Sequence, residues 1–132
     1  MTLEDDGTIW ATSDQIHPGP DITTVGRIWH FNQDGSLIDE FTNVYDTSAN
    51  ECEGIAIIPS TGKVLIADDS TGLLYHCNRD CTIYGATMDV EALGVTSIQD
   101  VEYDRTDDTL WFICNLTKKL WHISLGGSLL GT

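Results

Sequence analysis

The chain has few basic residues. Three lysines and three arginines stand against 21 aspartates and glutamates, which gives the 132 residues a formal net charge of −15. Because nucleic acids are bound by basic stripes or patches, this scarcity disfavours direct nucleic-acid binding. Anionic membrane surfaces are disfavoured for the same reason. The charge itself fits two interpretations, a solubilising surface and a surface that binds cations.

Long apolar runs are also missing. No stretch approaches the length of a transmembrane helix, and residues 1–6 lack the basic and apolar regions of a signal peptide. We therefore expect neither feature in this chain, and the compartment stays open. A Gly-x-Ser-x-Gly nucleophile elbow and a phosphate-binding glycine loop are likewise missing, so nucleophilic and nucleotide chemistry have no support.

A short phrase recurs three times at intervals of 46 residues. It reads Ile28-Trp29-His30-Phe31, then Leu74-Tyr75-His76-Cys77, then Leu120-Trp121-His122-Ile123. A fixed period of about 20–50 residues indicates a solenoid, a propeller or another array. The repeat is therefore the primary signal for the fold.

Each repeat consists of short apolar runs separated by turn residues. In the second repeat these runs are residues 53–58, 63–67, 72–77 and 82–87. Such runs indicate antiparallel strands, and no stretch has a helical period. Four strands per 40–50 residues is about the size of a propeller blade. The sequence predicts an all-β fold, one domain of three four-stranded antiparallel blades at residues 1–43, 51–89 and 97–132.

The first blade departs from the other two. Ile9 aligns with Val64 at a spacing of 55 residues, whereas Trp29 aligns with Tyr75 at 46, so nine extra residues lie between its second and third strands. These fall in residues 15–25 and are expected to form a loop. Counting back aligns Met1 with Ala56, which predicts that the inner strand of this blade is truncated.

Three blades cannot close a ring, since propellers have about four to eight. The outward faces of the first and third blades would then be large exposed apolar surfaces, and such surfaces mark interfaces. Either the chain self-associates or it is part of a longer polypeptide. We expect half of a six-bladed propeller whose partner is a second copy, in a homodimer with an apolar interface above about 2,000 Å².

The four cysteines allow two disulfides at most. If disulfides form, Cys77–Cys81 across a hairpin and Cys52–Cys114 between adjacent blades are the pairs that geometry allows. The other interpretation is four free thiols, because Cys77 occupies the packing position of Phe31 and Ile123.

The repeated histidines are expected to be structural. His30, His76 and His122 occupy one repeat position, so they spread around the ring and do not converge on one metal ion. We expect them to be buried and to hydrogen-bond a neighbouring blade. Similarly, the tryptophans at 10, 29, 111 and 121 are assigned to the core.

Acidic and amide side chains are expected to converge at one end of the propeller axis. The starts of first strands and the ends of second strands share that end, where strand-end loops carry function in rigid scaffolds. The candidate ligands are Glu53, Asp68, Asp69 and Asp100, with Asp14, Asn115 and Gln99 as further candidates. Oxygen ligands of this kind suit Ca²⁺ or another divalent cation. The alternative is that these residues only end strands, as turn chemistry prefers.

Two segments resemble a known group of propellers. Residues 53–69, EGIAIIPSTGKVLIADD, resemble the "EGIA…TG.LYVADD" phrase of six-bladed propellers, and residues 26–38 resemble their "G.IY.F..DG.L" phrase. The chain is thus similar to the NHL, gluconolactonase-like and SdiA-regulated propeller group. That group includes Ca²⁺- or Zn²⁺-dependent lactonases, esterases and pure binding scaffolds. Gln99-Asp100-Val101 and Cys114-Asn115 depart from its phrases in the third blade.

The resemblance leaves two functions open. The first is a non-catalytic binding or assembly module with an acidic axial face. The alternative is a metal-dependent hydrolase of the lactonase or esterase kind, which would need a divalent ion with an open coordination position.

Overall fold

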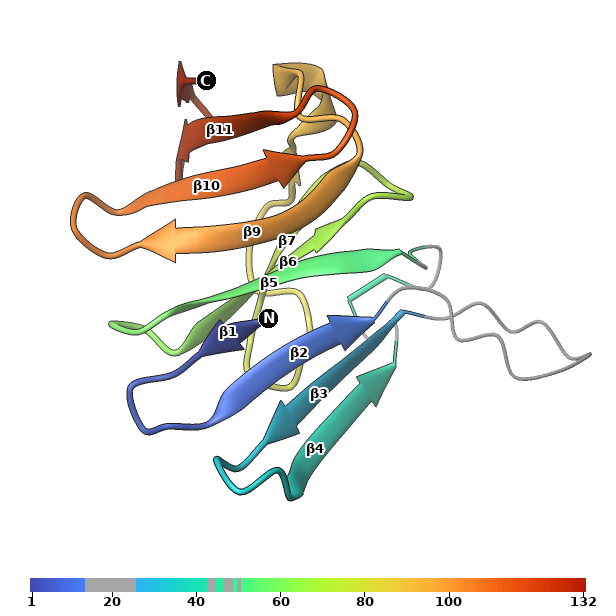
Figure 1. Ribbon diagram of the computed structural model, residues 1–132, viewed down its shortest axis with the longest axis vertical. Helices are drawn as coiled ribbons and strands as arrows, with labels where there is room; N and C mark the ends of the chain where they lie inside the picture. The colour runs from blue at the N-terminus through green and yellow to red at the C-terminus, as the bar shows by residue number, and fades with distance from the viewer. Residues whose placement is uncertain (14–25, 43–44, 47–48, 50) are drawn as a thin grey trace, which may run out of the picture.

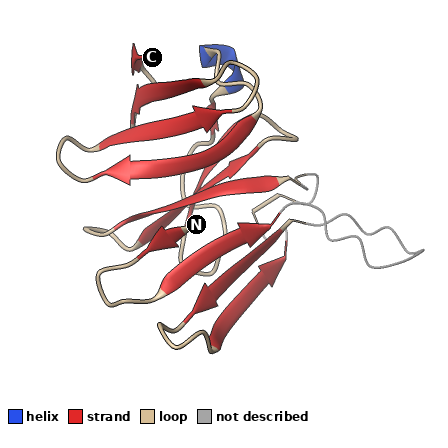
Figure 2. Ribbon diagram, viewed as in Figure 1, coloured by secondary structure: helices blue, strands red, loops and turns tan. Residues whose placement is uncertain are grey.

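The architecture is that of three antiparallel sheets fanned about a common edge (Figures 1 and 2). A computed structural model describes residues 1–13, 26–42, 45–46, 49 and 51–132. Each sheet has four strands that follow one another in sequence, and a short 3₁₀ helix, Glu91–Leu93, lies between the second and third sheets. The predicted all-β fold of blade-like sheets is confirmed.

The strands run in chain order from the inner to the outer edge of each blade. Blade 1 contains β1 (Thr2–Leu3), β2 (Ile9–Ser13), β3 (Arg27–Phe31) and β4 (Leu37–Thr42). Blade 2 contains β5 (Cys52–Ile58), β6 (Lys63–Asp68), β7 (Leu73–Cys77) and β8 (Met88–Asp89). Blade 3 contains β9 (Ile98–Asp104), β10 (Thr109–Cys114), β11 (Lys119–Ser124) and β12 (Leu129–Gly131).

The outer strand of blade 2 differs from the expected one at residues 82–87. The strand that pairs with β7 is Met88–Asp89, and Ile83 makes only an isolated bridge to Cys77. The reason is local, because the amides of Tyr84 and Gly85 both donate to the carbonyl of His76 and take the chain out of the ladder.

Two apolar cores lie between the three blades. Alternate residues of a strand point to opposite faces of its sheet. One face of blade 2 therefore packs Val64 and Ile66 against Trp10 and Ile28 of blade 1. The other face contributes Leu65 to a second core with blade 3. Each fully buried side chain of this size stabilises the fold by about 1.5–3 kcal/mol.

The inner hairpin of blade 1 is one residue shorter than its counterparts. Leu3 pairs with Ile9 across five intervening residues, 4–8, whereas six separate Ile57 from Val64 and Tyr103 from Leu110. Leu3, Ile57 and Tyr103 therefore occupy equivalent positions of β1, β5 and β9. The alignment of Met1 with Ala56 is shifted by one residue, since Thr2 and Ala56 are the equivalent pair.

Two of the repeated histidines, His30 and His122, stack on tryptophans of their own blades. His30 is buried against Trp10 with ring centroids 4.2 Å apart, and His122 stacks on Trp111 at 4.1 Å. His122 Nε2 lies 2.7 Å from the hydroxyl of Thr109, also in blade 3. The expectation of hydrogen bonds to a neighbouring blade is therefore wrong for His122, because its strand partner supplies both contacts. His122 is half-buried, as is His76.

Only one of the tryptophans is fully buried. Trp10 lies in the core between blades 1 and 2, whereas those at 29, 111 and 121 are half-buried. Trp29 and Trp111 lie on the outward faces of blades 1 and 3, which no third core covers among the described residues. The assignment of all four to the core is therefore wrong for these two.

All four cysteines are buried free thiols. Cys52, Cys77 and Cys81 belong to the core between blades 1 and 2, and Cys114 belongs to the core between blades 2 and 3. The structure therefore has the free-thiol arrangement, in which cysteines act as small apolar residues.

Within the described residues, no helix has the length and apolar character needed to cross a bilayer.

Candidate functional site

The start of the inner strands brings several of the predicted residues together. Asp69 Oδ1 accepts a 2.6 Å hydrogen bond from the amide of Ile98, which begins β9. Gly54, next to Glu53 in β5, lies directly against the backbone of Asp100. Glu53, Asp69 and Asp100 thus lie at one end of the inner strands, as the repeat predicts.

Asp68 is also at this end, but its side chain is fully buried. One carboxylate oxygen accepts hydrogen bonds from the Tyr45 hydroxyl at 3.1 Å and the Glu51 amide at 3.2 Å. The other accepts from the hydroxyl of Ser70 at 2.5 Å and the amide of Thr71 at 3.1 Å. The Thr71 hydroxyl also donates to this second oxygen, so five hydrogen bonds reach the carboxylate and leave little room for a cation, and those from Ser70 and Thr71 hold the β6–β7 turn. Burial, together with the nearby Cys52 and Asp68, raises the pKa of Tyr45 above its usual range.

Asp100 and the neighbouring amides make local contacts. Asp100 Oδ1 accepts from the amide of Val101 at 2.9 Å and lies 3.6 Å from the Met1 amine. The Gln99 side chain donates to the carbonyl of Ile98, and Asn115 Oδ1 accepts from Lys118 Nζ. Asp14 lies outside the described residues.

The fit of a divalent metal to this end is poor in the described part of the chain. No three His, Cys, Asp or Glu side chains there are grouped so as to hold a metal ion. Asp68 is saturated by backbone and hydroxyl donors, and one oxygen of Asp69 is engaged by β9. No reaction step through a metal is therefore derived from these residues.

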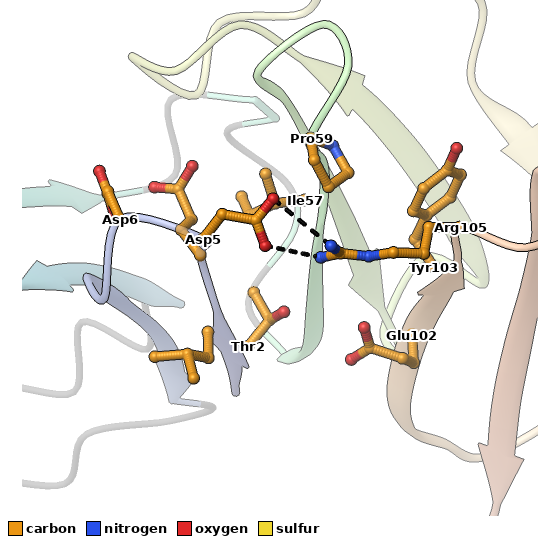
Figure 3. A pocket seen from close by; sticks show the side chains of 10 residues that line it. Thr2, Asp5, Asp6, Ile57, Pro59, Glu102, Tyr103 and Arg105 are labelled. Atoms are coloured by element: carbon orange, nitrogen blue, oxygen red, sulfur yellow. Dashed lines mark hydrogen bonds and ion pairs between the residues drawn. The ribbon is translucent and has the colours of Figure 1, made fainter.

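A cavity of about 210 Å³ lies at the opposite end of the inner strands (Figure 3). It is lined by side chains from all three blades: Thr2, Leu3, Glu4, Asp5, Asp6, Ile57, Pro59, Glu102, Tyr103 and Arg105. The equivalent residues Leu3, Ile57 and Tyr103 all contribute. A cavity surrounded by the same position of successive repeats lies on the axis about which the blades turn, where propellers have their channel.

Ion pairs cross the rim of this axial cavity. Arg105 reaches from blade 3 to Asp5 of blade 1, at 3.0 Å between Nη2 and Oδ1, as Figure 3 shows. Arg79 of blade 2 forms a bidentate pair with Glu4, with both distances 2.7 Å. The hydrogen bonds from Arg79, with that from Trp10, lower the pKa of Glu4 to about 2.

Glu102 has the opposite environment. Burial raises the pKa of Glu102, and the nearby charge of Asp100 raises it further. The lining of the cavity holds four carboxylates and the guanidinium of Arg105, while Arg79 pairs with Glu4 from outside the lining, so four carboxylates face two guanidiniums. Its electrostatic potential favours a positively charged group, because like charges at close range are unfavourable.

The sequence did not indicate Asp5, Glu102 or Arg105 as site residues. A signal was present, because all three fall at or just after the ends of first strands in the repeat. The repeat spacing favoured the opposite end, because its acidic residues recur more regularly.

Comparison with known proteins identifies a fold and no family. No family model matches the chain, and no curated protein matches it. Among solved structures, a luciferin-regenerating enzyme superposes with a TM-score of 0.67 at 17% sequence identity. That match covers 98% of this chain but 43% of the other, so the chain spans less than half of the protein it resembles. At this identity the likeness shows a β-propeller-like fold alone.

Proposed function

We propose that this chain is a non-catalytic binding module of the propeller kind, which takes a small positively charged ligand at its axial cavity. The observation that carries the proposal is the lining of that cavity, where the β1–β2 turn places Glu4, Asp5 and Asp6, and β9 places Glu102. Membership of the NHL, gluconolactonase-like and SdiA-regulated group is part of the same proposal.

The roles of the carboxylates at the strand starts support binding over catalysis. Asp68 holds a turn and Asp69 holds the start of β9, so both contribute to the scaffold. Glu102 is different, because its environment disfavours its own charge and would be relieved by a cation.

The experiment is calorimetric titration of the intact protein with two probes, Ca²⁺ and putrescine, at low ionic strength. We expect binding that Glu102→Gln weakens by about tenfold, as loss of one close charge of about 1.4 kcal/mol would give. Asp34→Asn is the matched control, since Asp34 is an exposed turn residue that pairs with Ser36 of its own hairpin. Binding of neither probe, or equal effects of both variants, would contradict the proposal.

Cation binding at the strand starts is tested in the same titration. If Ca²⁺ binds through Glu53, Asp69 and Asp100, then Glu53→Gln and Asp100→Asn weaken it while Glu102→Gln does not. Ca²⁺ would then raise the melting temperature by mass action on the folded state, and chelator would lower it.

The second candidate is a metal-dependent hydrolase of the lactonase or esterase kind. The observation in its favour is that the superposed structure carries the name of an enzyme. Turnover of simple lactones and aryl esters, measured with Ca²⁺, Zn²⁺ and Mn²⁺ and after chelation, tests it. Metal-dependent turnover that Glu53→Gln abolishes would favour the hydrolase over the binding module.

A further inference from the structure

The outward face of blade 3 is an apolar sheet surface without a covering blade. Strand register places Trp111 beside His122 and Ile113 beside Leu120 on this face. Ile113 is 49% exposed and Leu120 is 52% exposed, and both line an apolar hollow with Trp111. Side chains of this kind are normally buried.

The same repeat positions are buried in the two filled interfaces of this chain. The positions of Trp111 and Leu120 correspond to Trp10 and Ile28 in blade 1, which pack against blade 2. They correspond to Leu65 and Leu74 in blade 2, which pack against blade 3. The face of blade 3 is therefore built to receive the face that blades 2 and 3 turn toward their predecessors.

The outward face of blade 1 corresponds to the faces that blades 2 and 3 turn toward their predecessors. This face carries Ile9 paired with Phe31 and Ala11 paired with Trp29. The corresponding positions in blade 2 are Val64 with Cys77 and Ile66 with Tyr75, all buried against blade 1. In blade 3 they are Leu110 with Ile123 and Phe112 with Trp121, in or against the second core.

Between blades 2 and 3, a small and a large side chain, Ala67 and Phe112, belong to the same core. The repeat position of Ala67 is Ile113 in blade 3, and that of Phe112 is Ala11 in blade 1. At the open seam Ile113 of blade 3 would meet Ala11 of blade 1. One side chain is again large and the other small, but here the large one occupies the repeat position of Ala67. Likewise Leu120 would meet Trp29, as Leu74 meets the position of Trp121 in the core.

We propose that the outward face of blade 3 docks against the outward face of blade 1 of a second copy of this chain. Two copies joined in this way form two identical seams and six blades, within the range of about four to eight that closed propellers use. Glu102 lines both the axial cavity and the hollow on the outward face of blade 3. The variants that test the seam, at Leu120, Trp29 and Ala11, leave every residue of the axial cavity unchanged, so a failure of assembly can be told from a failure of cation binding.

The test is the molar mass in solution by light scattering and sedimentation equilibrium at micromolar concentrations. The wild type is expected to be a dimer. Leu120→Glu on blade 3 and Trp29→Glu on blade 1 should each raise the dissociation constant at least about 100-fold, because a charge placed in the centre of an interface removes its main contact. Leu116→Glu is the control, since Leu116 is 76% exposed in the β10–β11 turn and belongs to neither face. Ala11→Glu replaces Trp29→Glu if the latter fails to fold by circular dichroism.

Mixing the two seam variants distinguishes this arrangement from others. Leu120→Glu retains an intact blade 1 face and Trp29→Glu an intact blade 3 face, so an equimolar mixture should regain dimers through one good seam. A wild-type monomer would overturn the proposal and point to further blades in the same polypeptide. Failure of the mixture to dimerise, or a dimer disrupted by Leu120→Glu alone, would also overturn it, the latter by indicating contact between two copies of blade 3.

Discussion

Gly54 and Val101 bring the inner strands of blades 2 and 3 into backbone contact. A Cβ atom at Gly54 would lie 2.6 Å from the amide nitrogen of Val101 and 2.9 Å from the carbonyl carbon of Asp100. Real Cβ atoms do not approach backbone so closely, so the glycine sets the spacing between β5 and β9. The two strands in turn position the acidic residues at both ends of the axis.

Gly54→Ala should therefore destabilise the protein. Overpacking of this kind typically costs about 1–3 kcal/mol, because β5 and β9 would have to separate. Chemical denaturation measures the change. Gly126→Ala is the control, since a Cβ atom at Gly126 would lie 3.8 Å from the Ser124 hydroxyl oxygen, an ordinary van der Waals distance. Equal effects of the two variants would show that the strands are not in contact.

The Glu4–Arg79 pair should make stability depend on pH in the acid range. The folded-state pKa of Glu4 is about 2 against an ordinary value of 4.5. The pair therefore stabilises the fold fully above about pH 4.5, and this contribution is lost as the pH falls toward 2. We expect Arg79→Met to lower the free energy of unfolding by about 1–2 kcal/mol at pH 7, after allowance for the half-exposed arginine.

The control for this prediction is Arg105→Met. Arg105 pairs with Asp5 in solvent, with both side chains more than half exposed, so its loss should cost less than about 1 kcal/mol. Denaturation curves at pH 7, 4 and 2.5 should show the difference between wild type and Arg79→Met shrinking with acid. A difference that is constant with pH would contradict the assignment.

The thiols should be unreactive in the folded protein. Burial raises the pKa of Cys52 and that of Cys77 to about 12, and it raises the pKa of Cys81 and Cys114 as well. Because the thiolate is the reactive form, a disulfide reagent at pH 8 should titrate almost no thiol until denaturant is added, and four thereafter. Rapid reaction of one or more thiols without denaturant would show that a blade opens easily.

His30 should contribute more to stability than His122. His30 is buried on Trp10, 3.6 Å from Glu4 and 3.9 Å from Asp39, whereas His122 is half-buried on an outward face. In the monomeric Trp29→Glu variant, we expect His30→Gln to cost about 1–3 kcal/mol and His122→Gln less than half of that, measured by urea denaturation. In the wild-type dimer, where the seam covers the blade 3 face, the cost of His122→Gln should rise toward that of His30→Gln. Equal costs in the monomeric variant would contradict the prediction.

The strands were predictable because their signal is local and repeated. Alternation in β6, with Val64 and Ile66 on one face and Leu65 and Ala67 on the other, is visible in the sequence, and its recurrence every 46 residues identifies the blades. The roles of Asp68 and Asp69 were not visible. They are adjacent and equally acidic, yet Asp68 turns inward to Tyr45 while Asp69 reaches β9.

The position of the axial cavity could not be predicted from the repeat pattern, because it depends on the length of one turn. The β1–β2 connection is one residue shorter than those of the other blades, which brings Leu3 level with Ile57 and Tyr103. Which end of the axis is hollow depends on side-chain lengths at these positions and on the pair between Asp5 and Arg105, which are 100 residues apart.

Blade 2 is the blade with a core on each face, and this determines the order in which the chain should lose its structure. Every strand pairs with its neighbour in sequence, so a blade can open without disturbing the pairing of the others, as in repeat proteins. Detachment of blade 1 or blade 3 exposes one core, whereas detachment of blade 2 exposes both. In the monomeric Trp29→Glu variant, amide hydrogen exchange should thus be slowest for β5, β6 and β7 and become faster toward both ends of the chain.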